Sequence, residues 1–313
     1  MTVDNGNPAI SEFHFSSSDS VRIASARWEN RGPLRGVVQI AHGMGEHIGR
    51  YGETIDALTS AGLIVYGNDH RGHGRTALTT ADLGDFGAGG FDLLVEDVVR
   101  LGHIAREEHP NTPFFLLGHG IGSFAAQQYV LDHSRDLDGL ILSGSGALDG
   151  LARLARSGRS AYGLLDDGFD QARTPFDWLS RDDAVLDAFL DDPLCFAELK
   201  PAAFASFLAA GRRLADPVNL QRIVFDLPVY LFSGSDDPVG QELIGVQALI
   251  ERYREAGIHD IAHDFYPGGR HEMLNEINRA EVRARLVRWI SAVLDRQEGW
   301  LEPATGRINS IVN

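Results

Sequence analysis

The sequence contains one cysteine and one lysine, and both shortages restrict its chemistry. With Cys195 alone, an internal disulfide is excluded, and we expect a reducing compartment, the cytoplasm. Apolar neighbours surround Cys195, which predicts a small buried hydrophobe rather than a nucleophile. With Lys200 as the sole lysine and a net charge of −16, the chain repels nucleic acid and anionic bilayers at long range. We therefore predict no nucleic acid partner and no integral membrane association.

Long hydrophobic runs are also absent. No stretch reaches about 18 uninterrupted apolar residues, so no membrane-spanning helix is predicted. The first residues lack the basic and then apolar pattern of a secretory signal. Of the 313 residues, 43% are apolar, which is enough for one large α/β domain or two ordinary ones. No pattern in the chain predicts an oligomeric state.

Motifs for metals and cofactors are missing as well. His70 and His73 lack the i,i+4 spacing of paired ligands, and no third ligand stands near them. His271 is followed by glutamate but not by a second histidine at the spacing of a zinc protease. The glycines of segment 43–49 miss the dinucleotide-binding spacing by one residue. We therefore predict no metal and no cofactor.

Apolar strands and amphipathic helices alternate through most of the chain. This alternation predicts βαβ units, that is, an α/β fold with a mostly parallel central sheet and helices on both faces. A hairpin is expected over residues 13–26, and the other elements follow it. The predicted strands span 36–41, 63–66, 113–117, 137–143, 227–232 and 261–266, and the predicted helices span 45–61, 91–108, 121–133, 241–256 and 279–294.

The alternation stops between residues 147 and 223. This segment is rich in Ala, Leu, Asp and Arg, has helical patterning, and contains no buried-strand run. We predict a helical cap, or lid, inserted into an α/β core. The core would comprise residues 1–146 and 224–296, and residues 297–313 would form a C-terminal tail.

Segment 114–126 carries the clearest local signal: an apolar strand, a glycine-crowded turn and the start of a helix. Its frame at 118–122, Gly-His-Gly-Ile-Gly, has the layout of a nucleophile elbow, Gly-x-Ser-x-Gly, with Gly120 in place of the serine. Glycine adopts the strained angles of the apex without penalty, so the turn should form although its reacting oxygen is missing. The two outer glycines should allow close packing of strand and helix. Ser123 lies about one helical turn further on, so its hydroxyl should point elsewhere.

Polar residues follow three further predicted strands, at the edge of the sheet where open α/β folds bind ligands. The segment 42–47 follows the first buried strand, Asp236 and Asp237 follow the strand at 227–232, and His271 follows the last strand. A carboxylate there can orient a histidine, which can act as a general base. The order along the chain of elbow, acid and histidine is that of the α/β hydrolases.

Taken together, these motifs resemble the monoacylglycerol lipase and lysophospholipase group of α/β hydrolases, over about residues 12–295. The matching segments are 42–47, 69–74, 118–122, 178–182, 192–194, 234–239 and 266–272. The resemblance implies a serine-type carboxylic ester hydrolase with a mobile helical cap over an apolar pocket. It places Gly120 at the nucleophile position, Asp237, rather than its neighbour, as the acid, and His271 as the base. It also implies an oxyanion hole made by the backbone N–H groups of Met44 and Ile121.

The same resemblance implies a set of substrate contacts. Glu46 and Arg50 would lie near the polar end of the ligand, with a packing role as the alternative. The remaining predicted contacts are His42, Gly43, His119 and Trp178. Apolar residues of the predicted cap favour a hydrophobic ester such as a monoacylglycerol. They are Leu151, Leu154, Leu164, Leu165, Phe169, Phe176, Trp178, Leu179, Phe189, Leu190, Phe204, Phe207 and Leu208.

Three functional hypotheses follow. In the first, the chain is a serine-type lipase or esterase, inactivated by replacement of its nucleophile with glycine. In the second, Gly120 is natural, and His271 with Asp237 acts as a general base on water or on a substrate proton. In the third, the chain is a non-catalytic, ligand-binding pseudo-hydrolase.

Overall fold

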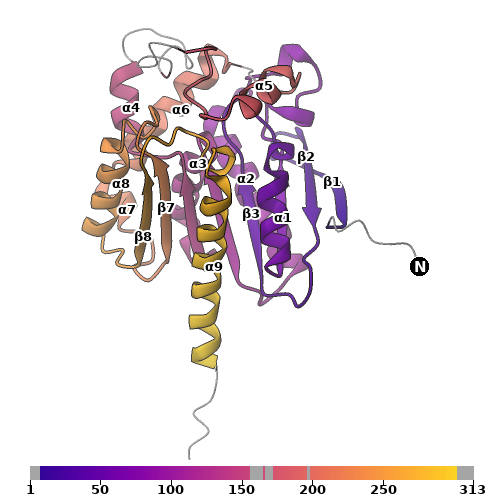
Figure 1. The fold of residues 1–313 in the computed structure, drawn as a ribbon, viewed down its shortest axis with the longest axis vertical. Coiled ribbons are helices and arrows are strands. Elements are labelled where there is room, and N and C mark those ends of the chain that lie inside the picture. Colours follow the sequence, from indigo (N-terminus) through magenta and orange to yellow (C-terminus); the bar gives the residue numbers. More distant parts are fainter. Residues whose placement is uncertain (1–7, 156–164, 166–171, 196–197, 302–313) are drawn as a thin grey trace, which may run out of the picture.

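An eight-stranded sheet forms the centre of the computed structural model, which describes residues 8–155, 165, 172–195 and 198–301 (Figure 1). The strand order is β1-β2-β4-β3-β5-β6-β7-β8, with β1 and β2 antiparallel to their neighbours and the remaining strands parallel. The strands are β1 (Ile10–Ser16), β2 (Arg22–Trp28), β3 (Gly36–Ala41), β4 (Leu63–Asn68), β5 (Phe114–His119), β6 (Gly139–Ser143), β7 (Val229–Gly234) and β8 (Ile261–Tyr266). The predicted α/β fold with a mostly parallel sheet is confirmed.

Helices cover both faces of the sheet. Consecutive strand residues enter opposite cores: Val37 packs with one buried cluster and Val38 with the other, as expected for strands buried on both sides. Helices α1 (Gly52–Ser60) and α9 (Arg279–Leu301) cover one face, and α2 (Gly90–Glu108), α3 (Ile121–His133) and α8 (Ile244–Glu255) contribute to the core on the other. Within the described ranges, no helix is both long and apolar enough to cross a bilayer.

The segment between β6 and β7 lies mainly over the carboxyl ends of the parallel strands (Figure 1). Its described part contains helices and no strand: α4 (Leu148–Leu154), α5 (Asp183–Asp191), α6 (Pro201–Leu214) and α7 (Pro217–Leu220). Helix α6 packs against α4, α2 and α3, so its apolar side continues the core of the sheet's second face. We refer to residues 147–223 as the helical segment.

Three predicted helix boundaries were wrong, each for a local reason. The helix expected from residue 45 begins at Gly52, after a short 3₁₀ turn, Ile48–Tyr51. The helix expected from residue 241 begins at Ile244, because Gln241, Glu242 and Leu243 all have positive φ angles, which an α-helix does not admit. Helix α9 runs to Leu301, into the predicted tail, and its last turns project beyond the sheet (Figure 1). Residues 295–299, Asp-Arg-Gln-Glu-Gly, contain no apolar side chain, so the apolar period that predicts the helix ends at Leu294.

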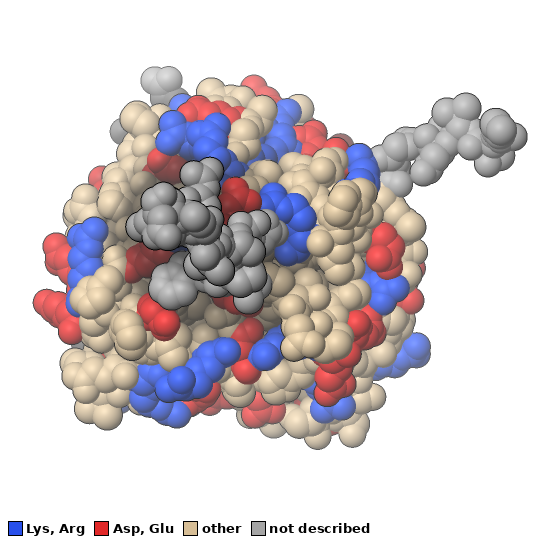
Figure 2. Space-filling model, turned by 90° about the horizontal axis from the view of Figure 1, so that it is seen from below, with Lys and Arg blue, Asp and Glu red and all other residues tan. Residues whose placement is uncertain are grey.

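The opposite end of the molecule carries charges of both signs. Figure 2 looks onto this end, where basic and acidic side chains are interspersed. Two of its ion pairs join Arg106 to Asp136 and Arg296 to Asp260. A shallow groove lined by these residues lies at the amino ends of the strands, far from the residues that follow the strands. The side chains that can carry chemistry therefore gather at the other edge.

Candidate active site

The tight turn between β5 and α3 places Gly120 at its apex. Gly120 has φ +50° and ψ −123°, a conformation that side-chain-bearing residues rarely adopt. The flanking glycines are required by close approach: a Cβ on Gly118 would lie 2.5 Å from the carbonyl oxygen of Gly122, and one on Gly122 would lie 2.2 Å from that of Ala41. The predicted close packing of strand and helix at this turn is confirmed.

Two residues that follow neighbouring strands meet beside this apex. Asp237 follows β7 and His271 follows β8, and His271 Nδ1 lies 3.0 Å from Asp237 Oδ1. Both side chains are buried. On its other side the imidazole faces the turn, since a Cβ built on Gly120 would lie 3.1 Å from His271 Nε2. Asp236, by contrast, is exposed, and its carboxylate accepts from the hydroxyl of its neighbour Ser235.

The surroundings tune the protonation of this histidine. Burial by itself would lower the pKa of His271, but the charge and hydrogen bond of Asp237 raise that pKa above its usual value of 6.5. The neighbouring ring of His119, 4.6 Å away between centroids, behaves differently. Burial and the proximity of His271 lower the pKa of His119 to about 4, so this ring is neutral at pH 7. One imidazole is thus prepared to accept a proton, and its neighbour is not.

The helical segment fixes the position of His271. The Trp178 ring packs against the imidazole at 5.2 Å between centroids. The backbone of this loop pairs with the helical segment as well: His271 N donates to Trp178 O (3.2 Å) and Glu272 N donates to Leu179 O (2.7 Å). On a further side, a Cβ built on Gly144 would lie 2.7 Å from His271 Cε1, so the ring rests directly on that glycine.

A narrow cavity lies beside Gly120. Its polar end is formed by Gly43, Glu46, His119, His271 and Glu272, and its remaining wall is apolar. The apolar lining residues are Met44, Ile121, Phe124, Leu151, Leu165, Trp178, Leu179, Phe204, Phe207 and Val239. Of the apolar residues predicted in the helical segment, Leu164 and Phe169 lie outside the described residues. A mostly apolar cavity with a few converging polar groups is typical of a small-molecule site.

The two residues predicted to form the oxyanion hole, Met44 and Ile121, line the cavity together with Gly120. Ile121 is the first residue of α3, so its N–H belongs to the helix turn that has no intrahelical acceptor. Met44 lies in the turn after β3. The amino end of a helix favours negative charge, so this corner suits a developing oxyanion.

A buried ion cluster forms the polar end of the cavity. Arg50 donates to Glu46 (2.9 Å) and, with both terminal nitrogens, to Glu272. Glu46 also accepts from Tyr51 and from the N–H of Gly43, each at 2.6 Å. Burial opposes ionisation of Glu46, but its charged and hydrogen-bonding neighbours, Arg50 foremost, hold its pKa below the usual range. Arg50 is not part of the cavity wall, which favours the packing role that the sequence left open.

The predicted substrate contact of His42 is not found, because His42 does not reach the cavity. Its Nε2 accepts from the His70 N–H (2.9 Å) and its Nδ1 bonds to Gly43 O (2.8 Å). Its ring lies against those of His70 and His73 in a fully buried cluster, and burial and the proximity of His73 lower the pKa of His42. His42 therefore shapes the turn that carries Met44. One signal in the sequence could have indicated this cluster: all three histidines follow the adjacent strands β3 and β4. The contacts between their rings could not be read from the sequence.

Ser123 is excluded as a substitute nucleophile by its surroundings. It is fully buried and does not line the cavity. Its hydroxyl donates to Gly120 O (2.6 Å) and lies 2.8 Å from Ser145 Oγ. The expectation that it points away from the apex is confirmed.

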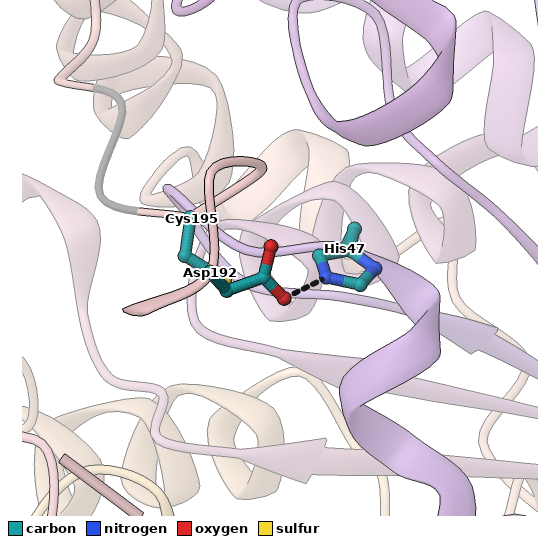
Figure 3. A group of neighbouring side chains, drawn as sticks. All are labelled: His47, Asp192 and Cys195. Carbon is teal, nitrogen blue, oxygen red and sulfur yellow. Dashed lines mark hydrogen bonds and ion pairs between the residues drawn. The ribbon is translucent and has the colours of Figure 1, made fainter. Parts of the chain in front are cut away.

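One group of metal-ligating side chains lies between the core and the helical segment. Ligand atoms of His47, Asp192 and Cys195 lie within 4.8 Å of one another (Figure 3). However, His47 Nδ1 accepts from the Gly49 N–H, so the ring proton sits on Nε2 and donates to Asp192 (2.9 Å). Burial raises the pKa of the Cys195 thiol, which disfavours the thiolate that a metal requires. These donors suit a hydrogen bond between core and helical segment better than a metal.

A second group of this kind, His103, His133 and Asp136, lies at the surface. Arg106 already pairs with Asp136 there. The competing cation leaves little net charge for a metal ion at this position.

The chain is similar to known hydrolases over most of its length. The family model described as serine aminopeptidase, S33 (Hydrolase_4) matches residues 32–278. A monoacylglycerol lipase of Mycolicibacterium smegmatis is 30% identical over 282 residues, which cover 90% of this chain and 96% of that protein. A monoglyceride lipase of Mus musculus is 25% identical, over 85% of this chain and 88% of that protein. The crystal structure of a thermostable carboxyl esterase from Bacillus coagulans in complex with glycerol superposes with a TM-score of 0.81 at 30% identity, covering 91% of this chain and 99% of that one.

Proposed function

The chain belongs to the monoacylglycerol lipase-like group of the α/β hydrolases, and on that premise we propose that its site is built to cleave carboxylic monoesters with one long apolar part, such as monoacylglycerols. In this proposal His271 is the general base, Asp237 orients it, and the N–H groups of Met44 and Ile121 stabilise the oxyanion. Gly120 occupies the place of the nucleophile. Without an alkoxide donor no acyl-enzyme forms, so the chain as it stands binds the ester with little turnover.

One observation carries the proposal. The His271 imidazole is hydrogen-bonded to a buried carboxylate through Nδ1, while its Nε2 faces the apex of the elbow. That arrangement supports the removal of a proton from a group at position 120.

The shape and charge of the cavity support an ester rather than a peptide substrate. An aminopeptidase site needs a carboxylate for the charged amino terminus of its substrate. Both carboxylates at the polar end, Glu46 and Glu272, are already paired with Arg50. The apolar wall suits an acyl chain, and the occupied ion cluster suits an uncharged polar head.

Restoring the serine tests this function. We expect the Gly120→Ser protein to react with a fluorophosphonate, with a mass increase at the introduced serine, and to hydrolyse a monoacylglycerol and a chromogenic short-chain ester. The Gly120→Ala protein should do neither. Hydrolysis of an amino-acid anilide in preference to both esters would contradict the ester assignment.

A second function is supported by the intact His271–Asp237 pair beside an open apex. A water held there could be activated by His271 and attack the ester directly. This function predicts slow hydrolysis by the unmodified chain that disappears in His271→Ala. A purely ligand-binding role predicts no turnover with or without the serine.

Gly144 offers a test of the position of His271. In the Gly120→Ser background we expect Gly144→Ala to lower kcat/KM by about 100-fold, because the added Cβ would displace the imidazole and misplacement of a catalytic group by about 1 Å costs this much. Gly257→Ala is the matched control: Gly257 also has a positive φ, but a Cβ there meets nothing within 4 Å. Both variants should lose about 1 kcal/mol of stability in thermal unfolding. Equal activity of the two would show that contact with Gly144 does not position the ring.

A further inference from the structure

Gly120 lacks the CH₂–OH group, a primary alcohol, that a serine would carry at this position. The atoms nearest to a Cβ built there are His271 Nε2 at 3.1 Å and the Gly43 Cα at 3.3 Å, both slightly closer than ordinary contact, so a free alcohol must lie further out, in the cavity. Gly120 itself lines the cavity, which makes this place continuous with the room for an ester. The missing group, CH₂–OH, differs from free methanol by one hydrogen atom.

We propose that this chain takes a small primary alcohol from solution as its nucleophile and transfers the acyl group of an ester to it. The inference rests on the proposed ester-hydrolase function and adds to it a second substrate and a different product. The chain is then an acyltransferase to methanol or ethanol that needs no covalent intermediate.

Residues on the cavity wall can accept and return the proton and stabilise the charge that this reaction produces. The alcohol O–H donates to His271 Nε2, and as its oxygen bonds to the carbonyl carbon, its proton passes to that nitrogen. The negative charge moves to the carbonyl oxygen, beside the N–H groups of Met44 and Ile121. When the intermediate collapses, the bond to the leaving alcohol breaks and that alcohol takes the proton from Nε2. An ester and methanol thus become a methyl ester and the original alcohol, and His271 ends as it began.

The surroundings favour a small alcohol over water and over a branched alcohol. The Cα of Gly43 and the side chains of Ile121 and Phe124 offer apolar contact to a methyl or methylene group, which water lacks. A free carbon lies at van der Waals distance from the Gly120 Cα, so the alcohol sits further into the cavity than a bonded side chain would. Trp178 and His119 close the space on either side of His271, which limits the size of the guest.

The experiment uses the unmodified chain, pretreated with a fluorophosphonate to silence contaminating serine hydrolases. With about 1 M methanol we expect ester consumption to rise about 10-fold but to stay far below that of Gly120→Ser, because a free nucleophile lacks most of the effective molarity of a tethered one. The methyl ester should be the main product by mass spectrometry, and the rate should fall in the order methanol, ethanol, 2-propanol. His271→Ala should abolish the methyl ester. Gly120→Ala should reduce it strongly, because its Cβ occupies the space.

The outcomes separate this inference from the proposed function. If Gly120→Ser hydrolyses the ester but the unmodified chain yields only free acid in methanol, the acyl transfer is wrong and the ester-hydrolase function stands. If neither protein reacts, both are wrong. The inference would also be overturned if the ratio of alkyl ester to free acid were the same with methanol, ethanol and 2-propanol. This measurement requires no substituted protein.

Discussion

Replacing Gly120 with serine should raise kcat/KM for a monoacylglycerol by about 10⁴- to 10⁶-fold, the range lost when a serine hydrolase is deprived of its nucleophile. The reason is geometric: the base is already hydrogen-bonded to Asp237 and lies 3.1 Å from the position of the new Cβ. That contact is slightly close, so the imidazole must move by a few tenths of an ångström. Steady-state kinetics with the ester before and after substitution measure the gain.

Stability should change in the opposite direction. The apex has φ +50°, which costs a residue with a Cβ about 1–2 kcal/mol in strain. Gly120→Ala is the control, because it adds the same strain without the oxygen. We expect both variants to unfold at a similar, lower temperature and only the serine variant to gain activity. A folded serine variant with no gain would contradict the assignment of the site.

The strands were predictable because parallel strands buried on two faces leave uninterrupted apolar runs. The first residues of the helices were harder to predict. The three positive φ angles at Gln241, Glu242 and Leu243 carry no glycine or asparagine signal, so the pattern of α8 extended falsely backwards. Their conformation is held by short backbone hydrogen bonds such as Glu242 N to Asp237 O and Ile244 N to Gln241 O, which leave no periodic signal in the sequence.

At the site, the residues at strand ends were predictable and their partners were not. Asp237 and His271 follow buried strands, and their meeting at one edge of the sheet is a consequence of parallel topology. Arg50 and His42 lie close to Glu46 in the sequence, yet neither side chain lines the cavity. Arg50 donates to Glu272, and His42 accepts from the N–H of His70. The packing of Trp178 on His271 joins segments about 90 residues apart, and only the folded chain brings them together.

In the serine-restored protein, Asp237→Asn should lower kcat by about 10⁴-fold. The Asp237 carboxylate accepts from both His271 Nδ1 and the N–H of Val239 (2.9 Å) through Oδ1. An amide that turns its NH₂ to this position donates to Nδ1 and moves the ring proton to Nε2, so the histidine has no lone pair for the serine and the Val239 hydrogen bond is lost. An amide that keeps its oxygen there lacks the negative charge that stabilises the protonated ring. Asp236→Asn is the matched control, since its carboxylate is exposed and lies outside the site, and it should leave the rate unchanged.

Asp237→Asn and its control Asp236→Asn should also differ in the pH dependence of their activity. Because Asp237 raises the pKa of His271 above 6.5, activity should rise with pH through an apparent pKa above that value, as the base becomes neutral. In Asp237→Asn the residual activity should titrate at lower pH, because burial then lowers the pKa of His271 against only the charges of Glu272 and Glu46. A group whose pKa is raised by folding stabilises the protein in its protonated form, so the stability lost in Asp237→Asn should be largest below pH 6.5 and shrink as the pH rises through the pKa of folded His271. An identical acid limb in both variants would mean that Asp237 does not act through His271.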